Sequence, residues 1–220
     1  MYKLDLHTHS IGSPDGGLRL EDYQQALTSG RLDYVAITDH ETIETAQSFC
    51  KQLGDLANQI IVGEEIKTTD GEIIGLYLNE AIPSGLTPRQ AVAAIKSQNG
   101  IVYIPHPFET VRSGISKVAL KEIIDDVDII EVHNGRAVFG SRGDLAKIWA
   151  SKYDKAGAAS SDAHGARGWF KTYSSVNEAP NRDNMVEILM TAELQIGMVG
   201  LGILYPKINR LKRKFRRGNI

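Results

Sequence analysis

Short runs rich in β-branched and other apolar residues alternate along the chain with longer segments whose apolar positions recur every three or four residues. The runs predict strands over the ranges 2–6, 33–38, 59–66, 72–78, 101–105, 127–133, 157–161 and 172–176. The longer segments predict helices over 20–29, 42–57, 87–98, 117–125, 139–153 and 182–193. Strands separated by helices of this length are typical of repeated βαβ units and a parallel sheet.

One pair of strands departs from this alternation. The ranges 59–66 and 72–78 are joined by a segment that contains Asp70-Gly71, and an Asp-Gly turn is typical of an antiparallel hairpin. The rest of the pattern favours a single α/β domain over residues 1–206, folded as a barrel. The whole chain of 220 residues is at the short end of the range for a barrel of strands and helices.

The composition is that of an ordinary soluble domain, with 42% hydrophobic and 24% charged residues. A single cysteine excludes a disulfide within the chain and favours a reducing compartment. The N-terminal segment has no apolar stretch typical of a signal peptide, and no run approaches the ~18 to 20 apolar residues that a membrane span needs. We therefore expect a cytoplasmic protein without a transmembrane segment. A net charge of −2 argues against a strongly basic nucleic-acid binder.

The charge is unevenly distributed. Residues 207–217 hold seven of the 25 Lys and Arg and none of the 27 Asp and Glu, which leaves 18 cations against 27 acids before them. Apolar Ile208, Leu211 and Phe215 recur at helical spacing within this tail. We favour a terminal helix over 207–220 that docks on the barrel through this stripe, with solvated cations. The alternative is a tail that recruits nucleic acid or lipid headgroups. The apolar range 196–205 predicts a last strand or a buried turn.

All six histidines lie at or just past the carboxyl end of a predicted strand. Several carboxylates arrive in the same way, and in a parallel barrel these strand ends converge on one face, where active sites are built. The histidines are His7, His9, His40, His106, His133 and His164, and the carboxylates are Asp5, Asp15, Asp39, Glu65, Glu131 and Asp162. Six separate segments therefore bring imidazoles and carboxylates to one place.

The spacing of these residues indicates a metal centre. His7-Thr8-His9 puts two imidazoles on one side of an extended segment, and Asp162-Ala163-His164 repeats that arrangement. Imidazole nitrogens together with carboxylates suit Zn, Mn or Fe better than Ca or Mg. The number of ligands exceeds the ~3 or 4 that one catalytic zinc takes, so two or three divalent ions are expected.

These residues occur within motifs that resemble the PHP superfamily, named for polymerase and histidinol phosphatase. The motifs stand in the family's order from residue 5 to residue 164, and the rest of the chain fits the closing helices of its distorted seven-stranded, TIM-like barrel. They are DLHTHS (5–10), SPDG (13–16), AITDH (36–40), GEEI (63–66), PHPF (105–108), EVHNGR (131–136) and SSDAH (160–164). The resemblance implies a metal-dependent phosphoesterase with a multinuclear zinc, manganese or iron centre.

The resemblance also implies roles for individual residues. One metal would be held by His7, His9, Glu65 and Asp162, and a second by Asp15, His40 and His164 with Glu65 as a bridge. His106 would hold a third. Here the family's usual additional histidine between GEEI and HPF is missing, so the third site is absent, weaker or completed by His133, which otherwise lines the pocket. Asp39 and Glu131 are expected to orient imidazoles.

The expected chemistry is in-line hydrolysis of a phosphomonoester, such as a nucleotide or histidinol phosphate, by a metal-bound hydroxide. Glu65, Asp162 and His164 would carry it, and Arg136 and Arg167 are the first candidates to bind the phosphate, ahead of Arg112. A 5′–3′ exonuclease or oligonucleotide phosphatase would share the centre and use the basic tail. A metal-stabilised module without catalysis is the third alternative. The sequence leaves the substrate, the metal and the oligomeric state open.

Overall fold

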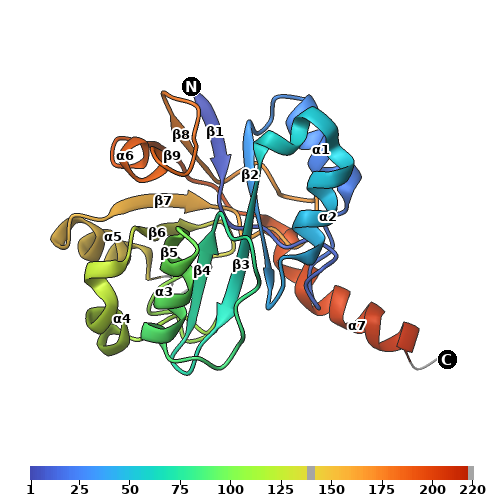
Figure 1. Cartoon of the computed structure of the whole chain (residues 1–220). Coiled ribbons are helices and arrows are strands. Elements are labelled where there is room, and N and C mark those ends of the chain that lie inside the picture. Colours follow the sequence, from blue (N-terminus) through green and yellow to red (C-terminus); the bar gives the residue numbers. More distant parts are fainter. Residues whose placement is uncertain (138–141, 218–220) are drawn as a thin grey trace.

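The computed structural model describes residues 1–137 and 142–217 (Figure 1). In these ranges one sheet contains the strands β1 (Tyr2–Asp5), β2 (Tyr34–His40), β3 (Ile60–Lys67), β4 (Glu72–Leu76), β5 (Ile101–Ile104), β6 (Ile129–Asn134), β7 (Ala156–Ser160), β8 (Tyr173–Val176) and β9 (Glu193–Gln195). The helices are α1 (Leu20–Thr28), α2 (Glu44–Leu53), α3 (Pro88–Ser97), α4 (Lys117–Ile123), α5 (Gly143–Lys152), α6 (Met185–Leu189) and α7 (Tyr205–Arg217). Short 3₁₀ turns span Gly54–Gln59, Ile124–Asp126 and Gly200–Leu204.

The sheet has the strand order β7-β6-β5-β4-β3-β2-β1-β8-β9. β1, β2 and β3 are parallel to one another, as are β5, β6 and β7, whereas β4 is antiparallel to both β3 and β5. β8 is antiparallel to β1. The parallel strands therefore place their carboxyl ends at one end of the sheet, and the predicted hairpin is confirmed as β3–β4.

The two ends of the sheet curl toward each other into a nearly closed, TIM-like α/β barrel, as predicted. β7 lies beside β8 and β1 although it pairs with neither as a regular strand. The buried hydroxyl of Ser174 bridges the gap, because it accepts from the Ala159 backbone N–H at 2.9 Å and donates to the Ala159 carbonyl at 3.1 Å.

Alternation along each strand divides the apolar residues between two layers. On β4, for example, Ile74 packs in a cluster with residues of every strand from β1 to β8, whereas its neighbour Ile73 packs with α3 and α4. The first cluster is the barrel interior, and Met185, Ile188 and Leu189 of α6 close one end of it. Helices outside and a filled interior make the barrel a rigid support for the loops at the strand ends.

Two regions at the C-terminal end differ from the prediction. β9 was not predicted, and the apolar range 196–205 forms the 3₁₀ turn with exposed Leu201 and Leu204 instead of a strand or a buried turn. The first residues of the predicted helix 139–153 and the last of the tail 207–220 lie outside the described residues.

The tail forms α7, but the expected docking through its apolar stripe is wrong. Ile208, Leu211 and Phe215 are exposed, and polar side chains hold the helix to the barrel instead. Asn209 donates to the carbonyls of Asp15 at 2.8 Å and His164 at 3.0 Å.

Every helix in the described part of the chain is too short or too polar to cross a bilayer.

Candidate metal centre

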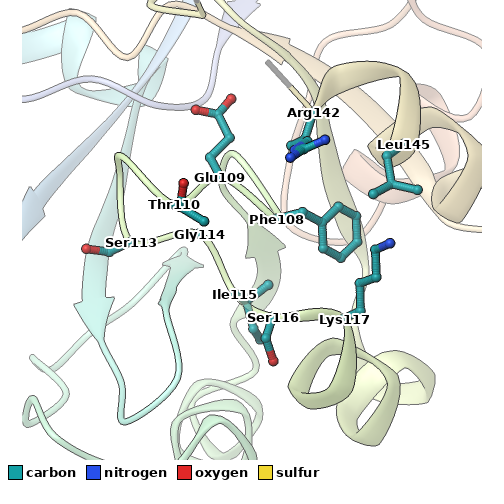
Figure 2. A pocket seen from close by; sticks show the side chains of 10 residues that line it. All are labelled: Phe108, Glu109, Thr110, Ser113, Gly114, Ile115, Ser116, Lys117, Arg142 and Leu145. Atoms are coloured by element: carbon teal, nitrogen blue, oxygen red, sulfur yellow. The ribbon is translucent and has the colours of Figure 1, made fainter. Parts of the chain in front are cut away.

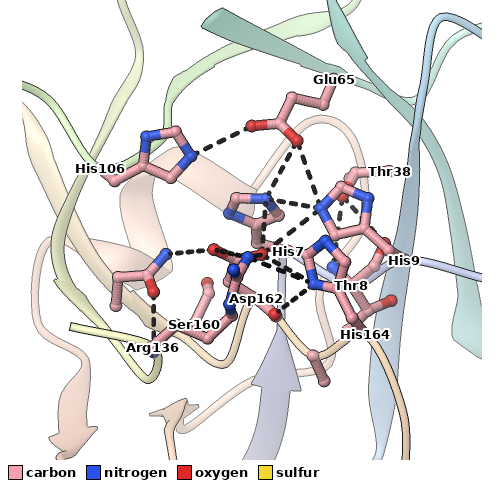
Figure 3. Close-up of polar contacts among 12 residues, drawn as sticks. His7, Thr8, His9, Thr38, Glu65, His106, Arg136, Ser160, Asp162 and His164 are labelled. Atoms are coloured by element: carbon pink, nitrogen blue, oxygen red, sulfur yellow. Dashed lines mark hydrogen bonds and ion pairs between the residues drawn. The ribbon is translucent and has the colours of Figure 1, made fainter. Parts of the chain in front are cut away.

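The two pairs of predicted ligands lie on adjacent segments at the carboxyl end of the barrel. Beyond β1 and β7 the chain forms a parallel bridge between Thr8 and Ala163, in which the His9 N–H donates to the Ala163 carbonyl at 2.9 Å. The Asp162 N–H donates to the His7 carbonyl, also at 2.9 Å. This pairing places the side chains of His7 and His9 beside those of Asp162 and His164 (Figure 3).

The Glu65 carboxylate, at the end of β3, lies between four imidazoles. Its Oε2 is 3.2 Å from His9 Nε2, 3.2 Å from His40 Nδ1 and 3.5 Å from His7 Nε2. Its Oε1 is 3.2 Å from His106 Nε2 (Figure 3). One carboxylate thus contacts imidazoles that come from three different segments.

A second group lies on the other side of His9. Oδ1 of Asp15 is 3.5 Å from His40 Nε2 and 3.7 Å from His164 Nε2, and the ring of His9 stacks on that of His40 with centroids 4.5 Å apart. Nitrogens of His9, His40 and His164 all lie within 4.8 Å of one another. These donors have the composition of a cation site.

Unsatisfied polar atoms show that these residues fit a bound cation. Nε2 of His7 and Nε2 of His9 face each other at 3.1 Å, and buried Asp15 Oδ1 and Glu65 Oε2 have no hydrogen-bond donor. Buried polar atoms are almost always satisfied, and divalent ions accept this set of nitrogen and oxygen donors. The residues therefore fit one or more divalent metal ions.

The protonation of the cluster leads to the same conclusion. Burial lowers the pKa of His9, but the adjacent carboxylates of Asp162 and Glu65 outweigh burial and bring this pKa to about 9. Burial raises the pKa of Asp162, but the positive charges of Arg136 and His7 hold it well below its usual range. The pKa values of His7 and His9 are both raised, so protons on these two imidazoles would offset part of the carboxylate charge, and a bound metal ion would replace those protons.

Glu131, on β6, contacts the imidazole of His7 and the backbone of His106. Its Oε1 accepts from His7 Nδ1 at 3.1 Å and from the Tyr103 hydroxyl at 2.9 Å, and its Oε2 accepts from the His106 backbone N–H at 2.7 Å. Asp39 acts indirectly: it accepts from the Ser13 hydroxyl at 2.8 Å, and that oxygen lies 3.1 Å from His9 Nδ1. Such outer contacts fix the ring orientation of a metal ligand.

Glu72 is a potential ligand that sequence reasoning missed. Its Oε2 lies 3.9 Å from His106 Nε2, and it groups with His40 and Glu65. Burial, with the charges of Glu65 and Asp162, raises the pKa of Glu72 to about 9. The predicted hairpin contained the necessary signal, because the pairs Glu65–Ile74 and Lys67–Glu72 place both glutamates on one face.

Two residues of the cluster have left-handed backbone conformations. φ is +53° at Asp162 and +28° at His106, and neither is a glycine. Such conformations cost of order 1–3 kcal/mol and concentrate at functional sites. The surrounding hydrogen bonds therefore maintain these two side chains in positions that the chain would not adopt locally.

Of the three arginines considered from the sequence, Arg136 and Arg112 reach the cluster, and Arg167 does not. Arg136 and Arg112 each contact the Asp162 carboxylate at 3.1 Å, and both line the adjacent cavity. Arg112 therefore has the same access to the cavity as Arg136, although the sequence analysis placed it behind Arg136 as a candidate to bind phosphate. Arg167 is exposed and is not among the described residues that line the cavity.

His133 also lies apart from the cluster. It is on β6, two residues after Glu131, but a register irregularity separates the two in their pairing with β7. Its Nε2–H donates to the Gly197 carbonyl at 3.2 Å instead. A bulge re-aims a side chain, so His133 does not complete a third site in this structure.

The cluster opens into a cavity of about 730 Å³. Its wall includes Arg112, Arg136, the exposed Val111, and Leu204, Lys207 and Arg210 from the C-terminal region. Nη2 of Arg210 is 2.6 Å from Asp15 Oδ2.

A neighbouring pocket of about 490 Å³ lies between the loop 108–117 and α5. Figure 2 shows residues that line it, among them Lys117 and Arg142.

A family model, the PHP domain, matches residues 5–163. The chain belongs to the PHP domain family. This match includes every histidine and carboxylate of the cluster from His7 to Asp162 and ends one residue before His164. An uncharacterised protein of Methanocaldococcus jannaschii is 38% identical over 143 residues, which are 60% of this chain and 81% of that protein.

Solved structures share the PHP barrel. A two-domain protein of Bacteroides vulgatus that contains a predicted PHP-like metal-dependent phosphoesterase superposes with a TM-score of 0.72 at 18% identity, over 89% of this chain and 65% of that one. A protein of Bifidobacterium adolescentis, proposed to be a metal-dependent phosphoesterase, gives 0.60 at 17% identity, over 84% and 95%. This chain thus spans about two thirds of the two-domain protein, and the likeness concerns the fold.

Proposed function

We propose that this PHP domain is a hydrolase, a metal-dependent phosphoesterase that acts on a small phosphomonoester. The observation that carries the proposal is the convergence of eight expected ligands in one largely buried cluster, with unsatisfied oxygens on Asp15 and Glu65. PHP-like neighbours described as metal-dependent phosphoesterases support the same reaction class.

The donors suggest how two or three Zn, Mn or Fe ions would be held. His7, His9, Glu65 and Asp162 contact one another and would hold the first ion. Asp15, His40 and His164 would hold the second, with Glu65 between the two. His106 would take part in a third, for which Glu72 is the nearest additional carboxylate.

When bound, divalent ions lower the pKa of water and stabilise negative charge on phosphate oxygens. The chain contributes cations around the same cavity. Arg112 and Arg136 are only 12% and 15% exposed, and the Nε–H of Arg136 has no acceptor. Guanidinium groups bind phosphate oxygens with paired hydrogen bonds, so these two side chains would orient the substrate.

The first test is a panel of phosphomonoesters assayed with Mn²⁺, Zn²⁺ or a chelator. We expect turnover that the chelator abolishes, and we expect the double variant Asp162→Asn/His164→Ala to lose both bound metal and turnover, because it removes a donor from each proposed site. The control is His133→Ala, which changes a histidine outside the cluster. A double variant that retains metal content and turnover would exclude this mechanism.

A second candidate substrate is a 5′-phosphorylated oligonucleotide. Lys207 and Arg210 of α7 line the cavity, which extends its positive charge beyond the arginines near Asp162. Short 5′-phosphorylated RNAs and DNAs in the same panel distinguish an oligonucleotide substrate from a small phosphomonoester. Selective hydrolysis of oligonucleotides over small phosphomonoesters would favour the exonuclease or oligonucleotide phosphatase. A protein that binds metal but hydrolyses neither would be a metal-stabilised module.

A further inference from the structure

The C-terminal helix α7 has one face on the barrel and the opposite face in solvent. Asn209 and Arg213, one turn apart, point to the barrel, where Arg213 donates to the Ile11 carbonyl and Asn209 to those of Asp15 and His164. Figure 1 shows α7 extending away from the body of the molecule at the C-terminal end. These polar contacts fix which side of the helix faces outward.

The outward side is apolar. Ile208, Leu211 and Phe215 are 40%, 55% and 71% exposed, and their spacing of three and four residues aligns them along one side of the helix. Leu201 and Leu204 in the preceding turn are 62% and 47% exposed. A soluble domain normally turns such a stripe inward, so a contiguous apolar surface of this kind indicates an interaction site.

Cations border this stripe. Lys207, Lys212 and Lys214 are exposed between its apolar residues, and no acidic residue follows Glu193 in the chain. A helix with an apolar side and many Lys and Arg is typical of segments that lie in the plane of a lipid surface, where apolar side chains enter the acyl boundary and cations meet anionic headgroups.

We propose that α7 and the 3₁₀ turn before it dock this protein onto the surface of a membrane that contains anionic lipid. A symmetric dimer through the same face would use the same patch on both copies and so bring two sets of cations together. Repulsion between these like charges disfavours the dimer. A single-stranded nucleic acid would use cations with aromatic stacking platforms, and Phe215 is the one aromatic residue in the exposed stripe. An anionic bilayer satisfies both the aliphatic stripe and the cations.

Docking in this orientation would place the cavity beside the lipid surface. Leu204, Lys207 and Arg210 belong to the docking segment and also line the cavity wall. The cluster would then face the layer of headgroups and the solvent next to it. The docking itself does not depend on the proposed reaction, because Leu211 and Phe215 in the middle of the apolar stripe are not among the residues that line the cavity.

The test is co-sedimentation of the full chain with vesicles of phosphatidylcholine alone or mixed with phosphatidylglycerol. We expect binding to the mixed vesicles that weakens as salt concentration rises, since salt screens the headgroup charge. Leu211→Asp/Phe215→Asp should lower the partition coefficient at least about tenfold, because it replaces inserted apolar groups by charges. The matched control is Val118→Asp on α4, a 71% exposed valine away from α7, which should bind as the parent does.

Three outcomes would overturn the proposal. The first is equal sedimentation, or none, with both kinds of vesicle, and the second is an unchanged partition coefficient for the double variant. The third is a stable dimer of the parent in gel filtration with light scattering that becomes a monomer in the double variant. Loss of oligonucleotide binding in the double variant, without a change in vesicle binding, would assign the face to nucleic acid instead. Circular dichroism of the variants confirms that each remains folded.

Discussion

Most imidazoles in the cluster have a defined contact on the ring nitrogen that faces away from the proposed metals. His7 Nδ1 meets Glu131, His9 Nδ1 meets the Ser13 hydroxyl, and His164 Nδ1 lies 2.9 Å from the Asp162 carbonyl. His106 is different, because its buried Nδ1 has no partner. At the scale of single residues, the first two proposed metal positions are therefore better organised than the third.

A second buried carboxylate lies next to the cluster without joining it. Glu64 precedes Glu65 on β3 and points to the opposite side of the strand, where its Oε2 accepts from the Ile82 N–H at 2.8 Å and its Oε1 has no partner. Burial raises the pKa of Glu64 from 4.5 to about 7. Because the folded protein binds this proton more tightly than the unfolded chain does, unfolding releases it between these two pH values.

Glu64 therefore destabilises the fold as the pH rises. Between pH 4.5 and about 7, we expect the free energy of unfolding of the parent to fall relative to that of Glu64→Gln, which keeps the acceptor for Ile82 and cannot ionise. Urea denaturation of both proteins across this range measures the difference, and other titrating groups cancel in the comparison. Parallel stability curves for the two proteins would show that the pKa of Glu64 is not raised in the folded protein.

At the scale of elements, α7 forms part of the wall of the cavity at the metal cluster as well as part of the exposed surface. Gly17 and Gly165 allow its close approach, because a Cβ at Gly17 would lie 2.8 Å from the Asn209 amide and one at Gly165 2.8 Å from the Tyr205 ring. This packing brings Arg210 to Asp15 and makes it part of the cavity wall. The basic tail thus has a role in shaping the site that its charge alone does not reveal.

Removal of the Arg210 side chain should weaken substrate binding more than turnover. Arg210 is 66% exposed, so solvent reduces its contribution to about 0.2–1 kcal/mol. We expect Arg210→Ala to raise KM for a phosphomonoester by up to about fivefold, with little change in kcat, and the effect should shrink at high salt. Arg213→Ala, on the same helix but outside the cavity wall, is the matched control. Equal effects of the two substitutions would indicate general loosening of α7.

At the scale of the whole molecule, the barrel closes through side chains as well as through strand pairing. The Ser174 hydroxyl forms hydrogen bonds with both the N–H and the carbonyl of Ala159 across the gap between β7 and β8. The bridge between Thr8 and Ala163 closes the same gap near the cluster. Closure at this point is what holds the segment 162–164 beside 7–9.

Loss of the Ser174 hydroxyl should therefore destabilise the barrel. Ser174→Ala leaves the buried N–H and carbonyl of Ala159 without that partner, which costs about 1–3 kcal/mol. Urea unfolding measures the loss, and the half-buried neighbour Ser175, on the other side of the strand, provides the control Ser175→Ala. If both variants unfold at the same urea concentration, the hydroxyl bridge does not contribute to closure.

Much of this fold could be predicted from the chain because strand and helix periodicity is local. The ranges of β1 to β8 agree with the predicted strands within a few residues, and the Asp-Gly turn identified the antiparallel hairpin. β9 has three residues, too few for alternation to distinguish it from a loop. The motifs also identified the family, since their order along the chain is itself a sequence property.

Position at a strand end, in contrast, does not determine where a side chain points. The sequence placed six histidines at one end of a barrel, but a bulge in β6 turned His133 away, and the hairpin register brought in Glu72. Arg112, Arg167 and the stripe on α7 were likewise decided by packing, because charge and periodicity do not specify which face of an element finds a partner. The sequence by itself determined the elements, the family and the residue types of the centre. Only the tertiary structure decided which of those residues meet and which face of α7 remains exposed, because both depend on contacts between segments far apart in the chain.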